Sequence, residues 1–401
     1  RDFAYNYLMS CEPNAILFTY GDNDTFPLWY LQEVEGVRTD VRIVNLSLLG
    51  TSWYISQMKL RTNQSAPLSM SLPMENYELG TNEEVYIIEK EEDTLTLKEA
   101  LDFITSKNPE TKIKYGKEQI SYLPAKSLVL PVNKDAVIKH GIVKEQDMDS
   151  IASNINFSIN RQTIGKSEMA MLDIIASNNW ERPIYFTTLN NGNLEFNEHL
   201  QYEGFTYKLI PIRTTRNDLA DLGRIDAEKL YHKLLHTYRY GNIDNCNVLV
   251  DEHTYVMVQN VHLLSMHTRT AESLVNENKI DKAKKLLNKC EELMLKCNFP
   301  INNSKLDVIY YLSFIEVHYK ANLVDKANEL VEELISETIK NLNYIFGLQP
   351  HISLTLDYEK EVNMHLLQSV SSLCQIYGQE ELSNKAFSKL IPYYKMYDDE
   401  E

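Results

Sequence analysis

The first 48 residues contain a strand, a helix and a second strand, and this order restricts the fold more than any other feature of the sequence. Residues 14–20 form a short apolar run that is typical of a buried strand. Residues 41–48 form a second such run. Residues 25–35, which lie between them and end before Gly36, place apolar side chains at helical spacing: Phe26, Leu28, Trp29, Leu31 and Val34. Two strands joined through a helix are expected to be parallel, with a right-handed crossover.

Strand and helix patterns continue to alternate up to about residue 215. The sequence predicts further strands at 85–89, 127–132, 183–188 and 205–212, the last as an antiparallel edge strand. It predicts helices at 96–106, with Thr96 as a suitable N-cap, and at 166–177. We therefore expect residues 1–215 to form an α/β domain with a mainly parallel, Rossmann-like sheet.

The second half of the chain has helical periodicity and almost no strand signal. The segment "NKIDKAKKLLNKCEEL" begins at Asn278, and the similar segment "NLVDKANELVEELISE" begins 44 residues later, at Asn322. A fainter third copy covers residues 379–394. In the first two copies a small alanine lies on the apolar face, where two helices can cross closely. Residues 216–401 are therefore predicted to form a tetratricopeptide-like helical repeat domain or a related α-solenoid.

The charge and the cysteine content argue against several functional classes. A formal net charge of -17 disfavours a nucleic acid or an anionic membrane surface as partner. The five cysteines are odd in number and form no CxxC pair, so we expect neither a zinc site nor a disulfide framework. Cys290 and Cys297 are interpreted as buried small apolar residues. No apolar run reaches the roughly 18 residues that a membrane span requires.

The segment Gly21–Thr25, "GDNDT", follows the first predicted strand and is the main candidate site. Ligands of open α/β sheets bind beyond the carboxyl ends of the strands, and the carboxylates of Asp22 and Asp24 suit Mg²⁺ or Mn²⁺ there. The alternative is structural: Gly21 and Asn23 favour a tight turn with positive φ, and the side chain of Asp24 or Thr25 caps the next helix. These two interpretations are compatible, since helix N-termini also attract anions.

Three further residues are candidate ligand-binding groups. Asn45 and Ser47 lie near the end of the second strand, beside the Gly21–Thr25 segment, and could line the same pocket. Arg182 precedes a predicted strand and could bind a ligand or pair with a carboxylate. The full hypothesis for a ligand site is Asp22, Asn23, Asp24, Thr25, Asn45, Ser47 and Arg182, with Asp22 and Asp24 as the metal ligands if there is a metal.

Several longer segments resemble one family of large bacterial membrane proteins, which was long classified as a domain of unknown function. They are residues 1–49, "SNNWERPIYFTT", "YEGFTYKLIPI", "LGRIDAEKLYHKL" and "YRYGN". The N-terminal part of that family has many transmembrane helices and resembles protein O-mannosyltransferases, so the resemblance implies a membrane-embedded, type C glycosyltransferase that uses a lipid-linked sugar. This chain, which starts at Arg1, is then expected to be a fragment: the soluble, periplasmic C-terminal region of a membrane-anchored parent.

The resemblance implies no catalytic residue in this region. The expected role is therefore noncatalytic, in recognition of an acceptor polypeptide or glycan or in assembly with the chain's own N-terminal transmembrane region. Two alternatives centre on Asp22 and Asp24: a metal-dependent sugar or phosphate enzyme, and a glycan-binding module without chemistry.

Overall fold

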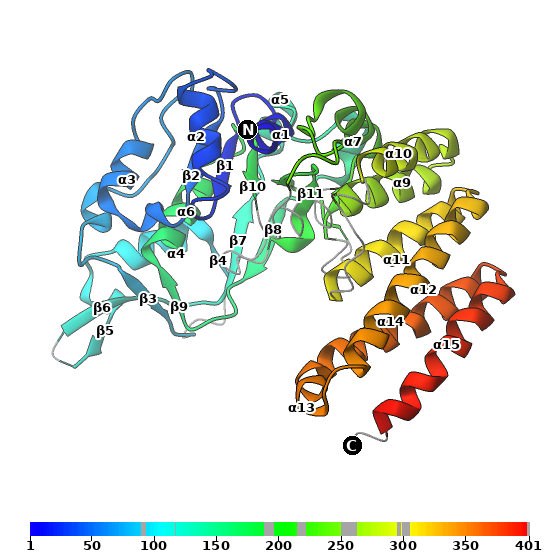
Figure 1. The fold of residues 1–401 in the computed structure, drawn as a ribbon. Coiled ribbons are helices and arrows are strands. Elements are labelled where there is room, and N and C mark those ends of the chain that lie inside the picture. Colours follow the sequence, from blue (N-terminus) through cyan, green and yellow to red (C-terminus); the bar gives the residue numbers. More distant parts are fainter. Residues whose placement is uncertain are drawn as a thin grey trace. The chain divides into compact units, whose positions relative to one another are not determined.

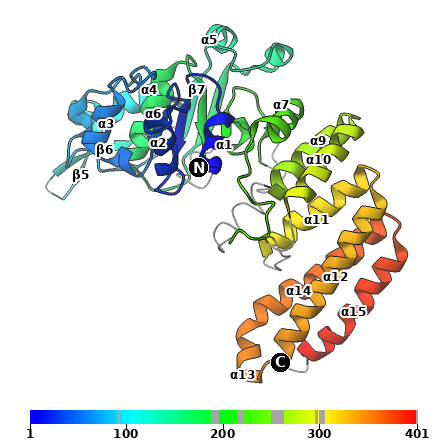
Figure 2. The same cartoon turned by 45° about the horizontal axis from the view of Figure 1, so that its top comes forward.

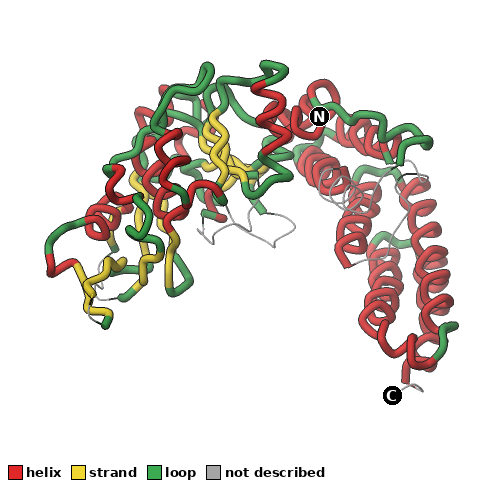
Figure 3. The backbone as a smooth tube through the Cα atoms, turned by 60° about the vertical axis from the view of Figure 1, so that its left-hand side comes forward, coloured by secondary structure: helices red, strands yellow, loops and turns green. Residues whose placement is uncertain are grey.

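The computed structural model describes residues 1–89, 94–116, 118–187, 196–214, 222–249, 263–294, 298 and 305–398. The chain divides into two compact units, Arg1–Asp226 and Ala227–Glu401. The boundary predicted from the sequence, between residues 215 and 216, lies outside the described residues. The first unit is mixed α/β, and the second consists of helices joined by loops in its described residues, as the colours of Figure 3 show.

A six-stranded sheet forms the centre of the first unit (Figure 1). Its strands, in spatial order, are β13 (Arg224–Ile225), β11 (Leu200–Tyr202), β12 (Tyr207–Leu209), β10 (Ile184–Phe186), β1 (Ile16–Thr19) and β2 (Arg42–Asn45). Strand β1 is parallel to both of its neighbours, whereas β12 is antiparallel to β10 and to β11. The predicted strand–helix–strand unit is confirmed, because α2 (Phe26–Glu33) joins β1 to β2. The sheet as a whole is mixed, because β12 runs opposite to the other five strands.

Two smaller sheets complete the strands of this unit. One has the order β5 (Lys112–Tyr115), β6 (Glu118–Leu123), β3 (Glu84–Ile87) and β9 (Thr163–Gly165). The other consists of β4 (Leu95–Thr96), β7 (Ser127–Pro131) and β8 (Asn154–Ser158). One continuous apolar core, which extends from Ile16 to Leu222, includes residues of all three sheets.

The described residues of the first unit form several α-helices. They are α1 (Asp2–Ser10), α2, α3 (Ser52–Met58), α4 (Leu97–Thr105), α5 (Lys134–Lys139) and α6 (Lys166–Asn178). The predicted cap at Thr96 is confirmed, since its hydroxyl accepts from the Glu99 N–H and the Glu99 carboxylate accepts from the Thr96 N–H. Helix α4 packs against α6, and the two lie side by side in Figures 1 and 2.

The helix predicted at residues 25–35 is confirmed as α2, but its apolar side chains differ in burial. Leu28 and Leu31 of α2 are buried, but Phe26 and Val34 are exposed. Helical spacing alone cannot distinguish the side of a helix that meets the sheet from an adjacent apolar side that stays in contact with water.

The second unit is built from helical hairpins. Its helices are α7 (Ala227–His232), α9 (Met266–Asn276), α10 (Ile280–Leu293), α11 (Lys305–Lys320), α12 (Val324–Phe346), α13 (Pro350–Ser353), α14 (Asp357–Ile376) and α15 (Glu380–Asp398). The pairs α9–α10, α11–α12 and α14–α15 each pack together. None of the described helices is both long enough and apolar enough to cross a membrane.

The same turn closes all three of these hairpins. Asn278, Asn322 and Gly378 have φ of 58°, 59° and 71°, and each lies between the two helices of its pair. The residue after each of them donates its N–H to a carbonyl near the end of the preceding helix, at 2.8, 2.9 and 2.8 Å. This is the six-to-one bond of a Schellman motif. The similarity found in the sequence therefore marks the second helix of each hairpin, together with the turn before it.

The cysteines differ in part from expectation. Cys290 is fully buried, as predicted, and Cys11, Cys290 and Cys374 are free thiols. Cys246, however, is disulfide-bonded. The expectation of no disulfide framework relied on the absence of a CxxC pair, but a disulfide can also join cysteines with other spacings. The expectation for Cys297 lies outside the described residues.

The left-handed turn at Asn322 can be tested with two substitutions that remove the same side chain. Asn322→Ala should lower the free energy of unfolding of the second unit by about 1 kcal/mol, because alanine is strained at positive φ. Asn322→Gly should leave it unchanged or raise it slightly. Denaturant unfolding followed by far-ultraviolet circular dichroism measures both. Equal stabilities of the two variants would contradict the assigned turn.

Candidate functional site

The segment Gly21–Thr25 connects the carboxyl end of β1 to α2. Gly21 adopts φ of +76°, as the turn requires, and the carbonyl of Asp22 accepts from the N–H groups of Thr25 and Phe26. Asn23, the other residue predicted to have positive φ, is not among the described residues that do. Pro27 lies in the first turn of α2, where its missing N–H costs little.

The predicted side-chain cap does not form. Thr25 precedes α2, but its hydroxyl accepts no bond from a helix N–H. Thr25 Oγ1 lies instead 2.7 Å from Thr19 Oγ1, and it is the backbone carbonyl of Thr25 that accepts from the N–H groups of Leu28 and Trp29. The prediction was wrong because the Thr25 hydroxyl bonds to the buried hydroxyl at the end of β1. The residues next to the start of the helix do not indicate this partner.

Asn45, at the end of β2, joins this turn to the neighbouring strand. Its Nδ2 donates to the Gly21 carbonyl at 3.1 Å and to Thr25 Oγ1 at 2.9 Å. Its Oδ1 accepts from the Leu48 N–H at 3.0 Å, and its own N–H donates to the Tyr54 hydroxyl at 2.9 Å. Asn45 is only 1% exposed, so the three side-chain bonds and the one backbone bond satisfy polar groups that would otherwise be costly to bury.

Asp24 connects the turn to the third parallel strand. Its Oδ2 accepts from the Tyr20 N–H at 3.0 Å and from the hydroxyl of Thr187, which directly follows β10. Its Oδ1 is buried and has no hydrogen-bond partner among the described residues. Burial raises the pKa of the Asp24 carboxyl, and the bonds from Thr187 and Tyr20 oppose this only in part.

The other predicted residues do not converge on this carboxylate. Asp22, Asn23 and Ser47 are exposed. Arg182 lies at the opposite end of the sheet, before β10, where it donates to the carbonyls of Asn14 and Ala15 and to Ser65 Oγ. Its pKa is lowered to about 10, chiefly by burial and then by the nearby Arg42. The structure therefore brings together Asp24, Thr25 and Asn45, and separates Arg182 from them.

No group of three or more potential His, Cys, Asp or Glu metal ligands occurs within the described residues. Asp22 and Asp24 could contribute only two carboxylates from this turn, and one oxygen of Asp24 is already hydrogen-bonded twice. A hard divalent cation at this position would take its remaining ligands from carbonyl oxygens and water.

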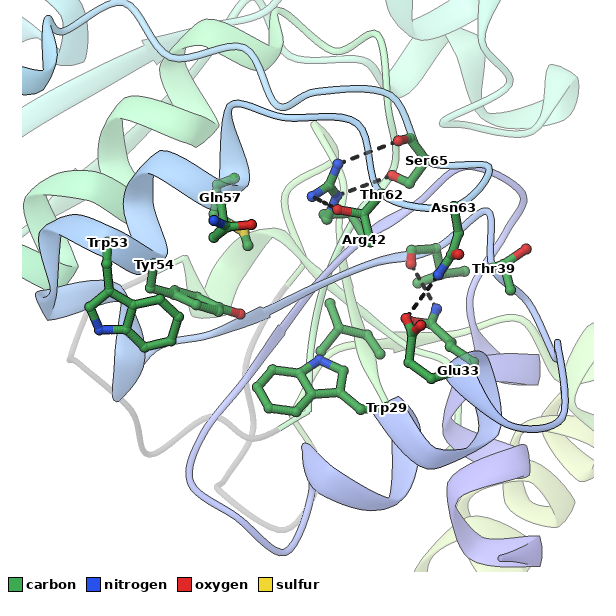
Figure 4. Close-up of a pocket in the computed structure, with 14 residues that line it drawn as sticks. Trp29, Glu33, Thr39, Arg42, Trp53, Tyr54, Gln57, Thr62, Asn63 and Ser65 are labelled. Carbon is green, nitrogen blue, oxygen red and sulfur yellow. Dashed lines mark hydrogen bonds between the residues drawn. The ribbon is translucent and has the colours of Figure 1, made fainter.

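A pocket of about 410 Å³ lies on the outer side of β2, the edge strand of the large sheet (Figure 4). Its aromatic lining comes from Trp29 of α2 and from Trp53 and Tyr54 of α3. The other lining residues come from α2, from residues 39–43, from α3 and from the loop after it: Gln32, Glu33, Thr39, Val41, Arg42, Ile43, Gln57, Met58, Thr62, Asn63 and Ser65. The analysis of the sequence missed this site. The available signal was that two of the three tryptophans in the whole chain fall within 25 residues of one another, on successive helices.

The family comparison covers the whole of the first unit. The model of the family described as TMEM260-associated domain 2 matches residues 1–229. No curated protein and no solved structure matches the chain. The matched range includes both the carboxyl ends of β1, β2 and β10 and the pocket on the outer side of β2. It is consistent with the resemblance to a membrane-protein family.

Removal of the Asn45 side chain should destabilise the first unit. Asn45→Ala leaves the Gly21 carbonyl and the Leu48 N–H without partners, so we expect the free energy of unfolding to fall by about 2–3 kcal/mol. Ser47→Ala, at an exposed position two residues away, is the control and should change it by less than about 0.5 kcal/mol. Tryptophan fluorescence reports this unit, since all three tryptophans belong to it. Equal stabilities would argue against Asn45 as the connecting residue.

The raised pKa of Asp24 predicts a pH-dependent difference between the wild-type protein and Asp24→Asn. A carboxyl whose pKa is higher in the folded state than its ordinary 3.8 favours folding at low pH, and this contribution is lost as the pH rises through the folded-state pKa. The melting temperature of Asp24→Asn relative to wild type should therefore increase as the pH rises from below 3.8. Asp22→Asn, at an exposed carboxylate, should melt close to wild type. A difference that does not change with pH would refute the raised pKa.

Proposed function

Since the chain belongs to the TMEM260-associated domain 2 family, we propose that it is the noncatalytic, extracytoplasmic region of a membrane-embedded, protein O-mannosyltransferase-like glycosyltransferase. In this proposal the chemistry takes place in a separate transmembrane part of the same protein. The region described here recognises the acceptor polypeptide or contributes to assembly of the enzyme.

One observation carries the noncatalytic role. At the carboxyl ends of β1, β2 and β10, where a ligand of an open α/β sheet is expected, the polar side chains bond to one another and to the backbone. Thr19, Thr25 and Asn45 are each at most 1% exposed. A catalytic site needs polar groups directed at a substrate, whereas these groups stabilise the junction of three strands and a helix.

The helical unit is the proposed acceptor-binding part. Its three hairpins share one turn geometry, which supports a tetratricopeptide-like repeat with longer helices. Ala283 and Ala327 are fully buried at equivalent positions of the second helices, as close helix crossings in such repeats require. Stacked repeats of this type present extended surfaces to polypeptides.

The disulfide at Cys246 supports the periplasmic placement, because disulfides persist in oxidising compartments and are rare in the cytosol. Cys11, Cys290 and Cys374 are free thiols in the described structure, so alkylation of the unfolded, unreduced protein from its native cells should label three thiols and leave Cys246 unlabelled. The Cys246→Ser variant should label four, since the substitution frees the partner of Cys246. Mass spectrometry of the alkylated chain measures both numbers. Five labelled thiols in the wild-type protein would count against an extracytoplasmic location.

The separate catalytic part can be tested directly. The coding sequence upstream of Arg1 is expected to encode several apolar segments of about 20 residues. Purified residues 1–401 should transfer no sugar from a lipid-linked donor to an acceptor protein. Robust transfer by this chain, or a start codon immediately before Arg1, would contradict the proposal.

The alternative is a metal-dependent sugar or phosphate enzyme, and the unpartnered, buried Oδ1 of Asp24 is the observation in its favour. Its ligand site would be Asp22, Asn23, Asp24, Thr25, Asn45 and Ser47, with Asp22 and Asp24 holding Mg²⁺ or Mn²⁺. This function requires a rise in melting temperature with Mn²⁺ or Mg²⁺ that both Asp22→Ala and Asp24→Ala abolish. If neither ion changes the melting temperature of the wild-type protein, the alternative is wrong.

A further inference from the structure

The pocket on the outer side of β2 combines aromatic rings with polar side chains that have unused hydrogen-bonding capacity. Trp29, Trp53 and Tyr54 line it, and Trp53 is 58% exposed although it is one of the largest apolar side chains. The amide of Gln57 lies above the three rings in Figure 4. Pockets of about 300–1,000 Å³ with apolar walls and a few polar groups are typical of small-molecule sites, and this one measures about 410 Å³.

The aromatic walls are held in place by ring contacts and a hydrogen bond that do not need a ligand. Phe26, which does not line the pocket, stacks on Trp29 with ring centroids 5.4 Å apart. The ring of Tyr54 meets that of Trp53 edge to face at 5.5 Å, and the Tyr54 hydroxyl accepts from the Asn45 N–H. Both tryptophans are thus oriented before any ligand binds, which lowers the entropic cost of binding.

The loop that forms the opposite wall is held by a buried arginine. Arg42, 3% exposed, donates from Nη1 to Thr62 Oγ1 at 3.0 Å and from Nη2 to the carbonyls of Leu60 and Ala66 at 2.7 and 2.9 Å. Asn63, in the same loop, donates to a carboxylate oxygen of Glu33 at 2.8 Å. The pocket is therefore preformed by contacts between β2, α2 and this loop.

The position of these contacts excludes a peptide strand as the occupant. An added strand would have to pair with the free edge of β2. The Tyr54 hydroxyl already accepts from the N–H of Asn45 on that strand, and the side chain of Arg42 extends from β2 to the loop at residues 60–66. Helix α3 and the loop thus occupy the space in which a further strand would lie.

The charge distribution favours a neutral ligand. Arg42 lines the pocket, but its guanidinium donates to hydroxyl and carbonyl oxygens of the loop. Glu33 contributes a carboxylate at the rim, and the chain as a whole carries a net charge of -17. An anionic group would be repelled, whereas hydroxyl groups could donate to Glu33 and exchange hydrogen bonds with Gln57.

We propose that this pocket binds a neutral pyranose ring of a glycan. The C–H groups of one face of the sugar would pack on the electron-rich faces of Trp53 and Trp29, and the ring hydroxyls would bond to Gln57 and Glu33. A pyranose has this combination of one apolar face and a polar perimeter, and the pocket offers both. The inference stands apart from the proposed role in glycosyl transfer, because it concerns a different part of the sheet from Gly21–Thr25.

Fluorine NMR of the full 401-residue chain labelled with 5-fluorotryptophan tests the proposal. The chain should give three signals, from Trp29, Trp53 and Trp180, which the Trp29→Phe and Trp53→Phe variants assign. Trp180 is an internal control, since it is 6% exposed and its Nε1 donates to the Pro131 carbonyl, away from the pocket. The methyl glycosides of mannose, glucose, galactose and N-acetylglucosamine are the probes.

At least one of these glycosides should shift the Trp29 and Trp53 signals saturably, with half-saturation at or below about 10 mM, and leave Trp180 unchanged. Gln57→Ala should weaken this binding by about tenfold. Gln64→Ala is the matched control, because Gln64 is exposed on the loop at residues 59–65 but does not line the pocket. This variant should bind like the wild type.

The proposal is overturned if no glycoside shifts these signals, or if all three tryptophans respond equally and without saturation. It is also overturned if free indole saturates the pocket and the sugars do not, which would indicate an aromatic side chain of a protein as the natural occupant. Preference for glucose 6-phosphate over the neutral glycosides would refute the argument from charge. None of these outcomes changes the test of the proposed function, which depends on the upstream coding sequence and on sugar transfer.

Discussion

The hydrogen bonds of the Asn45 side chain are the interaction on which the central part of the first unit depends. Strands β1 and β2 are buried along their whole length, so the chain must turn at their carboxyl ends without leaving polar groups unpaired. Asn45 satisfies the Gly21 carbonyl, the Thr25 hydroxyl and the Leu48 N–H at once. It thereby determines where α2 begins and how the chain leaves β2.

The same constraint explains why the Gly21–Thr25 segment resembles a ligand site in sequence but is mainly structural. Small polar residues at the end of a buried strand can serve either a ligand or the turn itself. Here Thr19, Thr25 and Asn45 bond to one another, and Asp24 bonds to Thr187. Among the side-chain atoms of this cluster, only Oδ1 of Asp24 is buried without a described partner. Burial is also what raises the pKa of this carboxyl.

On the outer side of β2, a buried charged side chain has its hydrogen bonds satisfied in a different way. Arg42 is buried without a carboxylate partner among its hydrogen bonds, and the oxygens of the loop at residues 60–66 surround its guanidinium instead. Arg182 donates to Ser65 of the same loop. The two guanidinium groups hold this loop against the edge of the sheet and so create a wall of the aromatic pocket. These hydrogen bonds of buried charged groups thus help to shape a pocket that has polar side chains with unused hydrogen-bonding capacity.

Features that depend on near neighbours could be predicted from the order of residues alone: the β1–α2–β2 unit, the cap at Thr96, the helices of the second half and the similarity between their hairpins. These follow from local periodicity and turn chemistry, which act over a few residues. Other features became visible only in the folded chain: the sheet is mixed, Thr25 bonds to Thr19 and not to its own helix, and Asp24 meets Thr187, 163 residues away. The pocket that Trp29 and Trp53 share is another such feature. The physical reason is that the partner of a buried polar or aromatic side chain is chosen by spatial proximity, and strand order sets this proximity independently of the distance along the chain.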